Sequence, residues 1–198
     1  MVVSISFFLS LTQYSYLESL YVAIAILAGQ CAVGWTNDFL DYQLDTEASR
    51  LKKPLVSGKV SREQLRTAIF FALFLAIALS LIGPLGVIGT LVHALGILSA
   101  TAYNFALKRT LFSVLPYMIS FGALPWAIYL SADKHPPAWL YLGFIFFSTA
   151  FHFLNVLKDL DVDLAQGIHG LPQRMGRSQS MALAAILATA GFLCVLIR

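Results

Sequence analysis

Charged residues are scarce in this chain. Asp, Glu, Lys and Arg make up 12% of its 198 residues, whereas hydrophobic residues make up 59% and the mean hydropathy is +0.78. Soluble domains usually carry about twice this share of charge. The composition therefore excludes an ordinary water-soluble globule and indicates a protein that crosses a membrane several times.

Cysteine is almost absent, and so are polar linkers. Cys31 and Cys194 both lie inside apolar runs, with no partner at the spacing of a metal site. We interpret both as small buried hydrophobic residues and exclude a disulfide framework. Because no Ser/Gly-rich or low-complexity stretch divides the chain, we expect residues 1–198 to form a single integral membrane domain.

Long apolar segments fill most of the sequence. A helix needs about 20 mainly apolar residues to cross a bilayer core. The segment 1–11 is too short to cross alone and lacks the basic start of a signal peptide, so we interpret it as the second half of a helix. The sequence predicts an all-α, multi-pass transmembrane bundle of about seven helices, the first one partial, with full spans at 16–36, 67–83, 85–107, 111–131, 138–157 and 181–197.

Basic residues indicate how the bundle is oriented. All Lys and Arg residues except Lys134 and Arg198 lie at alternate loops, and the largest group lies between residues 50 and 66. Loops rich in Lys and Arg stay on the cytoplasmic side. We therefore expect a multi-pass protein of the plasma membrane whose basic loops face the cytoplasm.

A first acidic cluster lies at the cytoplasmic end of the 16–36 segment. It contains Asp38, Asp41 and Asp45, preceded by Asn37. Separations of three, four and seven residues predict that the three carboxylates share one face of a helix.

A second acidic cluster, Asn155, Asp159 and Asp163, follows the 138–157 segment on the same side. Carboxylates beside hydrocarbon are costly, and neither cluster has a matching cation within the apolar segments. Oxygen ligands suit Mg²⁺, which commonly arrives with a phosphate group. Nearby basic residues and an apolar bundle behind the site favour an isoprenoid diphosphate as the ligand.

Four segments between residues 37 and 176 carry a specific pattern. They are Asn37-Asp38-x-x-Asp41-x-x-x-Asp45, Lys53-Pro54-Leu55-Val56-Ser57-Gly58, Tyr103-Asn104-x-x-x-Lys108-Arg109, and Asp159-x-x-x-Asp163-x-x-x-Gly167 followed by Leu171-Pro172 and Gly176. In this order they resemble the first acidic signature, the loop that follows it, the end of the fourth helix and the second acidic signature of the UbiA family of intramembrane prenyltransferases.

The resemblance implies a helical membrane enzyme, typically of nine transmembrane helices, whose active site opens to the cytoplasm. It would transfer a prenyl group from an isoprenoid diphosphate to a lipophilic, often aromatic, acceptor by Mg²⁺-assisted ionisation. The residues that the resemblance assigns are the catalytic Asp38, Asp41, Asp159 and Asp163; the Mg²⁺ ligands Asn37, Asp38, Asp41 and Asp45 for one ion and Asn155, Asp159 and Asp163 for the other; and the diphosphate-binding Arg50, Lys53, Tyr103, Lys108 and Arg109.

Aromatic faces stabilise nearby cations, so Tyr42, Tyr103 and Trp126 are candidates to stabilise the allylic carbocation. His152 lies one helical turn before Asn155 and extends that face, although an isolated histidine on a helix is more often a packed residue.

The chain departs from the family pattern in two ways. It has about seven helices and reads as shortened at both ends, and His169 stands where related sequences often have Arg or Lys. The alternative expectation is therefore a catalytically inactive, truncated membrane protein or a partner subunit of the same fold.

Other functional classes fit less well. A transporter is disfavoured because both acidic clusters lie at one membrane face. The DxxDGxxAR pattern of CDP-alcohol phosphotransferases is absent. We expect membrane lipid and the two substrates as partners and no nucleic acid, and the sequence leaves protein partners open.

Overall fold

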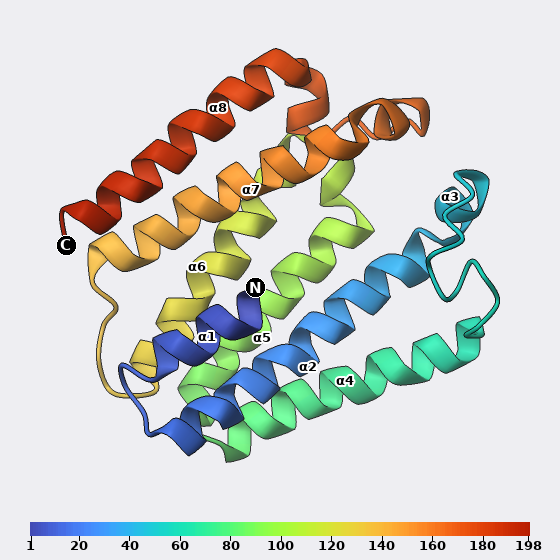
Figure 1. Ribbon diagram of the computed structural model, residues 1–198. Coiled ribbons are helices and arrows are strands. Elements are labelled where there is room, and N and C mark those ends of the chain that lie inside the picture. The colour runs from blue at the N-terminus through green and yellow to red at the C-terminus, as the bar shows by residue number, and fades with distance from the viewer.

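Eight α-helices and two short 3-10 turns make up the chain in the computed structural model, which describes residues 1–198 (Figure 1). Six helices are long and apolar enough to cross a membrane, which confirms the predicted helical bundle with its six full spans. The elements are α1 Val2–Ser10, α2 Tyr16–Leu40, α3 Tyr42–Glu47, α4 Arg62–Ile82, α5 Gly86–Phe105, η1 Leu107–Arg109, η2 Leu111–Val114, α6 Leu115–Leu130, α7 Ala138–Ala165 and α8 Leu171–Leu196.

Local sequence signals explain where several helices begin. α2 and α4 each begin with a capping box, formed by Ser15 with Glu18 and by Ser61 with Gln64. In this arrangement a serine and an acidic or amide side chain satisfy backbone N–H groups that the first helical turn leaves free. Pro84 lies in the short turn between α4 and α5, and Gly86 at the start of α5 has a φ of 56°.

The start of the last helix differs most from expectation. Pro116 and Pro125 both lie within the 111–131 span as expected, Pro116 in the first turn of α6 after η2 and Pro125 inside the helix. The last helix begins at Leu171, ten residues before the predicted span. Its polar first part resembles a loop in sequence, and a kink at Gly176, with a φ of 77° that favours glycine, separates it from the apolar part.

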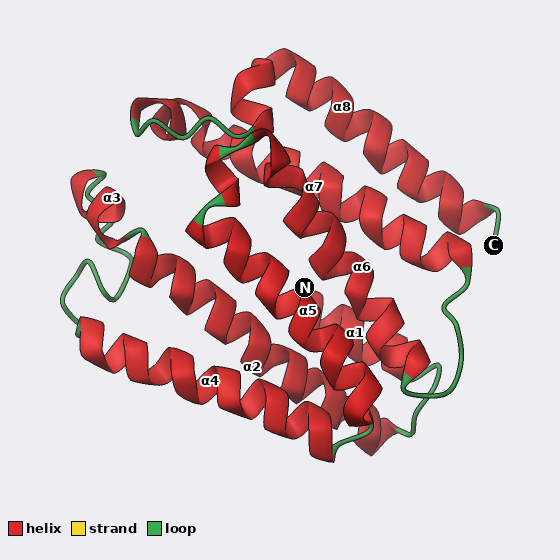
Figure 2. Cartoon of the chain, turned by 180° about the vertical axis from the view of Figure 1, so that it is seen from behind, coloured by secondary structure: helices red, strands yellow, loops and turns green.

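The spanning helices form an open arc. α7 and α8 pack together on one side, α2 and α4 pack together on the other, and α5 and α6 lie between them, as Figures 1 and 2 show from opposite sides. The short α1 packs against α2 and α6. The interior of the arc is therefore bounded by α1, α2, α5, α6 and α7.

The main packed core lies toward one end of the bundle, measured along the helix axes. It consists of Val22, Ile26, Leu85, Leu124 and Ile128, and it is close to the α4–α5 and α6–α7 turns. Only 48 of 198 residues are buried in the isolated chain, and apolar side chains such as those of Phe70, Phe71 and Phe74 point outward. This outward apolar surface is what a helix bundle presents to lipid.

Three connections lie at the other end of the bundle: the α2–α3 junction, the α5–α6 connection and the α7–α8 connection (Figure 1). Gln166 donates a hydrogen bond to the Leu44 carbonyl oxygen at 3.1 Å, which joins the end of α7 to α3. The fold thus brings together the segments that carry the two acidic clusters.

Candidate active site

Two cavities adjoin inside the arc, and they differ in character. The larger has a volume of about 770 Å³ and a largely apolar wall that includes Val33, Phe121 and Phe151. The smaller, of about 180 Å³, is mainly polar. Asn37, Tyr103, Tyr117 and Asn155 line both cavities, so the two meet at these four side chains. The larger volume lies within the range of ordinary ligand pockets.

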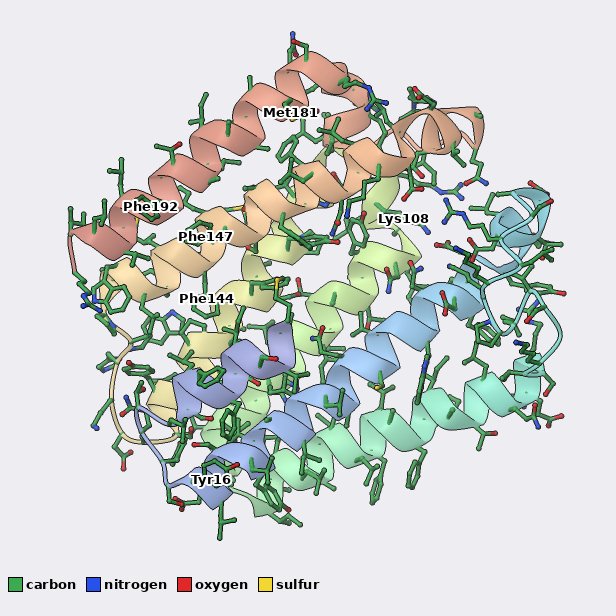
Figure 3. The ribbon with its side chains drawn as sticks, viewed as in Figure 1. Tyr16, Lys108, Phe144, Phe147, Met181 and Phe192 are labelled. Atoms are coloured by element: carbon green, nitrogen blue, oxygen red, sulfur yellow. The ribbon has the colours of Figure 1, made fainter.

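Side chains from five helical segments surround the smaller cavity, here called the polar cavity. They come from the α2–α3 junction, the α5–η1 junction, α6, α7 and the start of α8. In Figure 3, Lys108 lies near the end of the bundle where nitrogen and oxygen atoms gather. The residues that line the polar cavity are Asn37, Asp41, Tyr103, Lys108, Tyr117, Asn155, Val156, Asp159, Asp163, Ile168 and Gln173.

The first acidic cluster does not lie on one continuous helix, so that prediction is wrong. α2 ends at Leu40, and Asp41, with φ −86° and ψ 6°, joins it to α3. Aspartate is a weak residue for a helix interior, and Asp41 pairs with Lys108, whereas Asp38 and Asp45 both pair with Lys53. Asp38 lines the larger cavity, Asp41 lines the polar cavity and Asp45 is buried outside both.

Lysine and arginine side chains neutralise most of these carboxylates. Lys53 Nζ lies 2.8 Å from Asp38 Oδ1 and 2.6 Å from Asp45 Oδ2. Arg50 lies 3.4 Å from Asp45 Oδ1 and 3.2 Å from Asp159 Oδ1, and therefore connects the two acidic clusters.

A further ion pair lies inside the polar cavity. Lys108 Nζ pairs with Asp41 Oδ1, and its side chain is mostly buried. The apolar segments supply no cation to the acidic clusters, as the sequence indicates, and Arg50, Lys53 and Lys108 come from the segments between them. The basic side chains belong to loops that fold back onto the acidic segments, and sequence spacing does not reveal their path.

The environment of Lys53 favours its charged form. Burial lowers the pKa of its ammonium group, but hydrogen bonds to Asp38 and Asp45, together with their negative charges, outweigh burial and raise the pKa above its usual value. Lys53 therefore remains a cation at neutral pH and holds the two carboxylates together.

The donor set of the polar cavity fits Mg²⁺ chemically. Asp41, Asp159 and Asp163 supply carboxylate oxygens, and Asn37 and Asn155 supply amide oxygens. Hard divalent cations prefer such ligands. The carboxylates do not converge on one point as they stand, since no group of three acidic, histidine or cysteine side chains is arranged to hold a metal ion. Binding would therefore require Asp41 and Asp159 to release Lys108 and Arg50.

Several other sequence candidates lie away from both cavities. Arg109 is exposed and makes no ion pair. Tyr42 packs under the guanidinium of Arg62, and Trp126 packs against His135 and Tyr141. His169 is exposed. Of the aromatic candidates for stabilising a carbocation, Tyr103 alone lines the cavities.

Sequence reasoning missed Tyr117 and Gln173. Tyr117 lies in an apolar stretch and forms an edge-to-face pair with Tyr103, with ring centroids 5.3 Å apart. His152 packs against both tyrosines, is buried and has no hydrogen-bond partner. Gln173 is a buried amide in the polar cavity. Its occurrence directly after Leu171-Pro172, within a matched motif, was the available signal.

The fold and the site together define a multi-span membrane protein with a ligand-sized apolar chamber behind a polar, acidic mouth. The chain belongs to the UbiA prenyltransferase family, whose model matches residues 1–198. The sequence resemblance to this family is thereby confirmed.

Curated relatives match part of their length. The chain is 30% identical over 146 residues to 4-hydroxybenzoate octaprenyltransferase of Photobacterium profundum, covering 71% of this chain and 50% of the relative. It is 26% identical over 157 residues to the protein of the same name from Aliivibrio salmonicida, covering 77% and 54%. The chain thus spans about half the length of the curated relatives it matches.

Solved structures share the fold. A UbiA homologue from Archaeoglobus fulgidus bound to GPP and Mg²⁺ superposes with a TM-score of 0.79 at 14% identity, covering 92% of this chain and 66% of that one. The apo structure of a UbiA homologue from Aeropyrum pernix K1 has a TM-score of 0.79 at 20% identity, covering 98% and 75%. A digeranylgeranylglyceryl phosphate synthase has a TM-score of 0.73 at 17% identity, covering 98% and 70%.

Proposed function

We propose that this chain transfers a prenyl group from an isoprenoid diphosphate to a lipophilic acceptor that carries an aromatic ring. The observation that supports this most strongly is the junction of the two cavities at Asn37, Tyr103, Tyr117 and Asn155. A diphosphate in the polar cavity and a hydrocarbon tail in the larger one would meet at these side chains. The bond to be broken would then lie between the acidic mouth and the apolar chamber.

The acidic clusters would hold Mg²⁺ on either side of the diphosphate. Asn37, Asp38 and Asp41 would hold one ion, and Asn155, Asp159 and Asp163 the other. When bound, Mg²⁺ supplies positive charge that neutralises the phosphate oxygens and stabilises the departing diphosphate. The buried Asp45 contributes by orienting Lys53 and Arg50, with which it is paired.

Lys108 and Arg50 would change partners when the substrate binds. In this structure they neutralise Asp41 and Asp159. A magnesium diphosphate would take over these two carboxylates, and the released ammonium and guanidinium groups would then bind phosphate oxygens. The ion pairs thus keep the site electrically balanced before substrate binds and leave its cations next to the incoming diphosphate.

The chemistry follows from this arrangement. The bond between the first prenyl carbon and the diphosphate oxygen breaks, and its electron pair leaves with the diphosphate. Tyr103 and Tyr117, at the cavity junction, would face the resulting allylic cation and stabilise it with their ring electrons. A carbon of the acceptor ring donates an electron pair to form the new bond, and the ring then loses a proton.

An aromatic acceptor is supported by the two curated relatives, which are named for 4-hydroxybenzoate.

The loops at the polar cavity carry nearly all the basic residues of the chain. This distribution favours an orientation in the plasma membrane in which the polar cavity faces the cytoplasm.

Release of diphosphate from geranyl or farnesyl diphosphate tests the proposal. The full chain in liposomes should release diphosphate only with Mg²⁺, and an aromatic acceptor such as 4-hydroxybenzoate should stimulate the release. Asp38→Ala and Asp159→Ala should abolish release while membrane insertion survives. Glu47→Ala, which changes an exposed carboxylate of α3 outside both cavities, is the matched control and should leave release unchanged.

Two results would overturn the proposal. Near-normal release by either aspartate variant would contradict the two-metal assignment. An absence of release from the correctly folded chain with Mg²⁺ present would favour the alternative, an inactive protein or a partner subunit of the same fold.

A further inference from the structure

Gln173 is a buried amide in the polar cavity. It lies in the first turn of α8, and 7% of its surface is exposed. Its Nε2 donates a hydrogen bond of 2.9 Å to Asp163 Oδ2 from the neighbouring helix. Its Oε1 is buried and has no hydrogen-bond partner. Burying an unsatisfied amide oxygen costs free energy that a leucine of similar size would not, so packing alone does not account for a glutamine here.

Asp163 differs from the other carboxylates of the two clusters. Asp38, Asp41, Asp45 and Asp159 each lie within ion-pair distance of a lysine or arginine. Asp163 has no such partner, and the amide of Gln173 is its side-chain hydrogen-bond donor. A neutral donor fixes the orientation of a carboxylate without cancelling its charge. Asp163 is consequently oriented and free of a competing cation.

The backbone around Gln173 is held firmly in place. The Leu171 N–H donates to Ser113 Oγ at 3.1 Å, which ties the start of α8 to η2. Gly170 packs so closely that a Cβ there would lie 2.6 Å from the Lys108 carbonyl oxygen and 2.7 Å from Gln173 Oε1. The close approach to the Lys108 backbone therefore needs glycine at position 170, since any side chain there would clash.

We propose that Gln173 is a positioning residue that prepares Asp163 as the first carboxylate to accept a divalent cation. Asp163 could accept a divalent cation without first releasing a lysine or arginine. With that positive charge beside them, Asp41 and Asp159 would release Lys108 and Arg50 more readily. This inference rests on the proposed function, because it assigns an order of events at the same site.

The test measures metal binding directly. Mn²⁺, a paramagnetic substitute for Mg²⁺, is titrated into the full chain in detergent micelles with inorganic diphosphate, and free Mn²⁺ is followed by electron paramagnetic resonance. Loss of a hydrogen bond that orients a metal ligand typically weakens metal affinity by about 10- to 100-fold. We expect Gln173→Leu to weaken Mn²⁺ binding by about tenfold and to raise the Mg²⁺ concentration needed for half-maximal diphosphate release by a similar factor.

Two features separate positioning from a merely structural role. The maximal rate of Gln173→Leu at saturating Mg²⁺ should recover to near the unsubstituted value, and its melting temperature should not fall. Gln179→Leu makes the same change at an exposed position of α8 and should alter none of these quantities.

The outcomes distinguish this inference from the proposed function. Unchanged Mn²⁺ affinity in Gln173→Leu would overturn the role of Gln173 alone. Loss of maximal rate with unchanged affinity would assign Gln173 to the chemical step and also overturn it. An absence of Mn²⁺ binding by the unsubstituted chain would overturn both proposals.

Discussion

The two ends of the bundle use their polar groups in opposite ways. At the packed end, polar side chains satisfy one another and the backbone: the Tyr14 hydroxyl lies 2.5 Å from Ser131 Oγ and donates toward the carbonyl oxygens of Pro84 and Ile128. At the other end, charges are paired across loops around open cavities. The polar groups of the first end therefore stabilise the fold, while those of the second form ion pairs that a ligand could exchange.

This difference also explains why the acidic mouth tolerates so many charges. A buried ion pair is costly unless each charge has a good partner. Arg50, Lys53 and Lys108 provide partners for four of the five carboxylates, and the fifth, Asp163, has an amide. A site arranged in this way can remain folded without ligand and can still bind a cation.

Between the two ends, the larger effect should follow from removing Lys108. Lys108→Met takes away a phosphate-binding cation inside the polar cavity and should lower kcat/KM for prenyl diphosphate by about a hundredfold, the scale seen when one group that stabilises developing charge is lost. Lys134→Met makes the same change at the opposite end, where Lys134 contacts Gln13, and should change kcat/KM little. Both variants are assayed by diphosphate release. An equal loss of kcat/KM in Lys108→Met and Lys134→Met would contradict the assignment of substrate binding to one end of the bundle.

A smaller effect should follow at the packed end from Tyr14→Phe. Loss of the hydroxyl contacts should lower the free energy of unfolding by about 1 kcal/mol without changing kcat/KM. Tyr16→Phe is the matched control, because Tyr16 is 65% exposed. Thermal unfolding in detergent checks the stability, and a loss of activity with unchanged stability in Tyr14→Phe would contradict the assignment.

The same tyrosine predicts a pH dependence. Burial is the main cause that raises the pKa of Tyr14 above its usual value of 10.0. The phenol therefore ionises more readily in the unfolded chain than in the folded one. Its contribution to stability is complete below pH 10.0 and is lost as the pH rises through the raised pKa. The alkaline fall in melting temperature should be shallower in Tyr14→Phe than in the unsubstituted chain.

Much of the fold could be predicted because a membrane imposes simple rules. The six apolar stretches of the required length form the six spans. The alternate loops that carry the basic residues all lie at one end of the bundle. The start of α8 could not be predicted, because residues 171–180 are too polar to resemble a span and their helix depends on contacts such as Leu171 with Ser113.

The candidate site was predictable in composition but not in pairing. Asp41, Asp159, Asp163 and Lys108 do lie together in the polar cavity. The bend at Asp41, the exposure of Arg109 and the burial of Asp45 depend on how loops pack, which residue spacing does not encode. Tyr117 and Gln173 escaped notice because each is a single polar group whose partners are distant in sequence.

Binding of a metal diphosphate in the polar cavity can be observed by anomalous diffraction from crystals of the full chain with Mn²⁺ and a non-hydrolysable prenyl diphosphate. We expect metal peaks within about 2.2 Å of carboxylate oxygens of Asp41 and Asp163, with Lys108 moved from Asp41 onto a phosphate oxygen. Metal and diphosphate bound elsewhere, with the Lys108–Asp41 pair intact, would contradict this expectation.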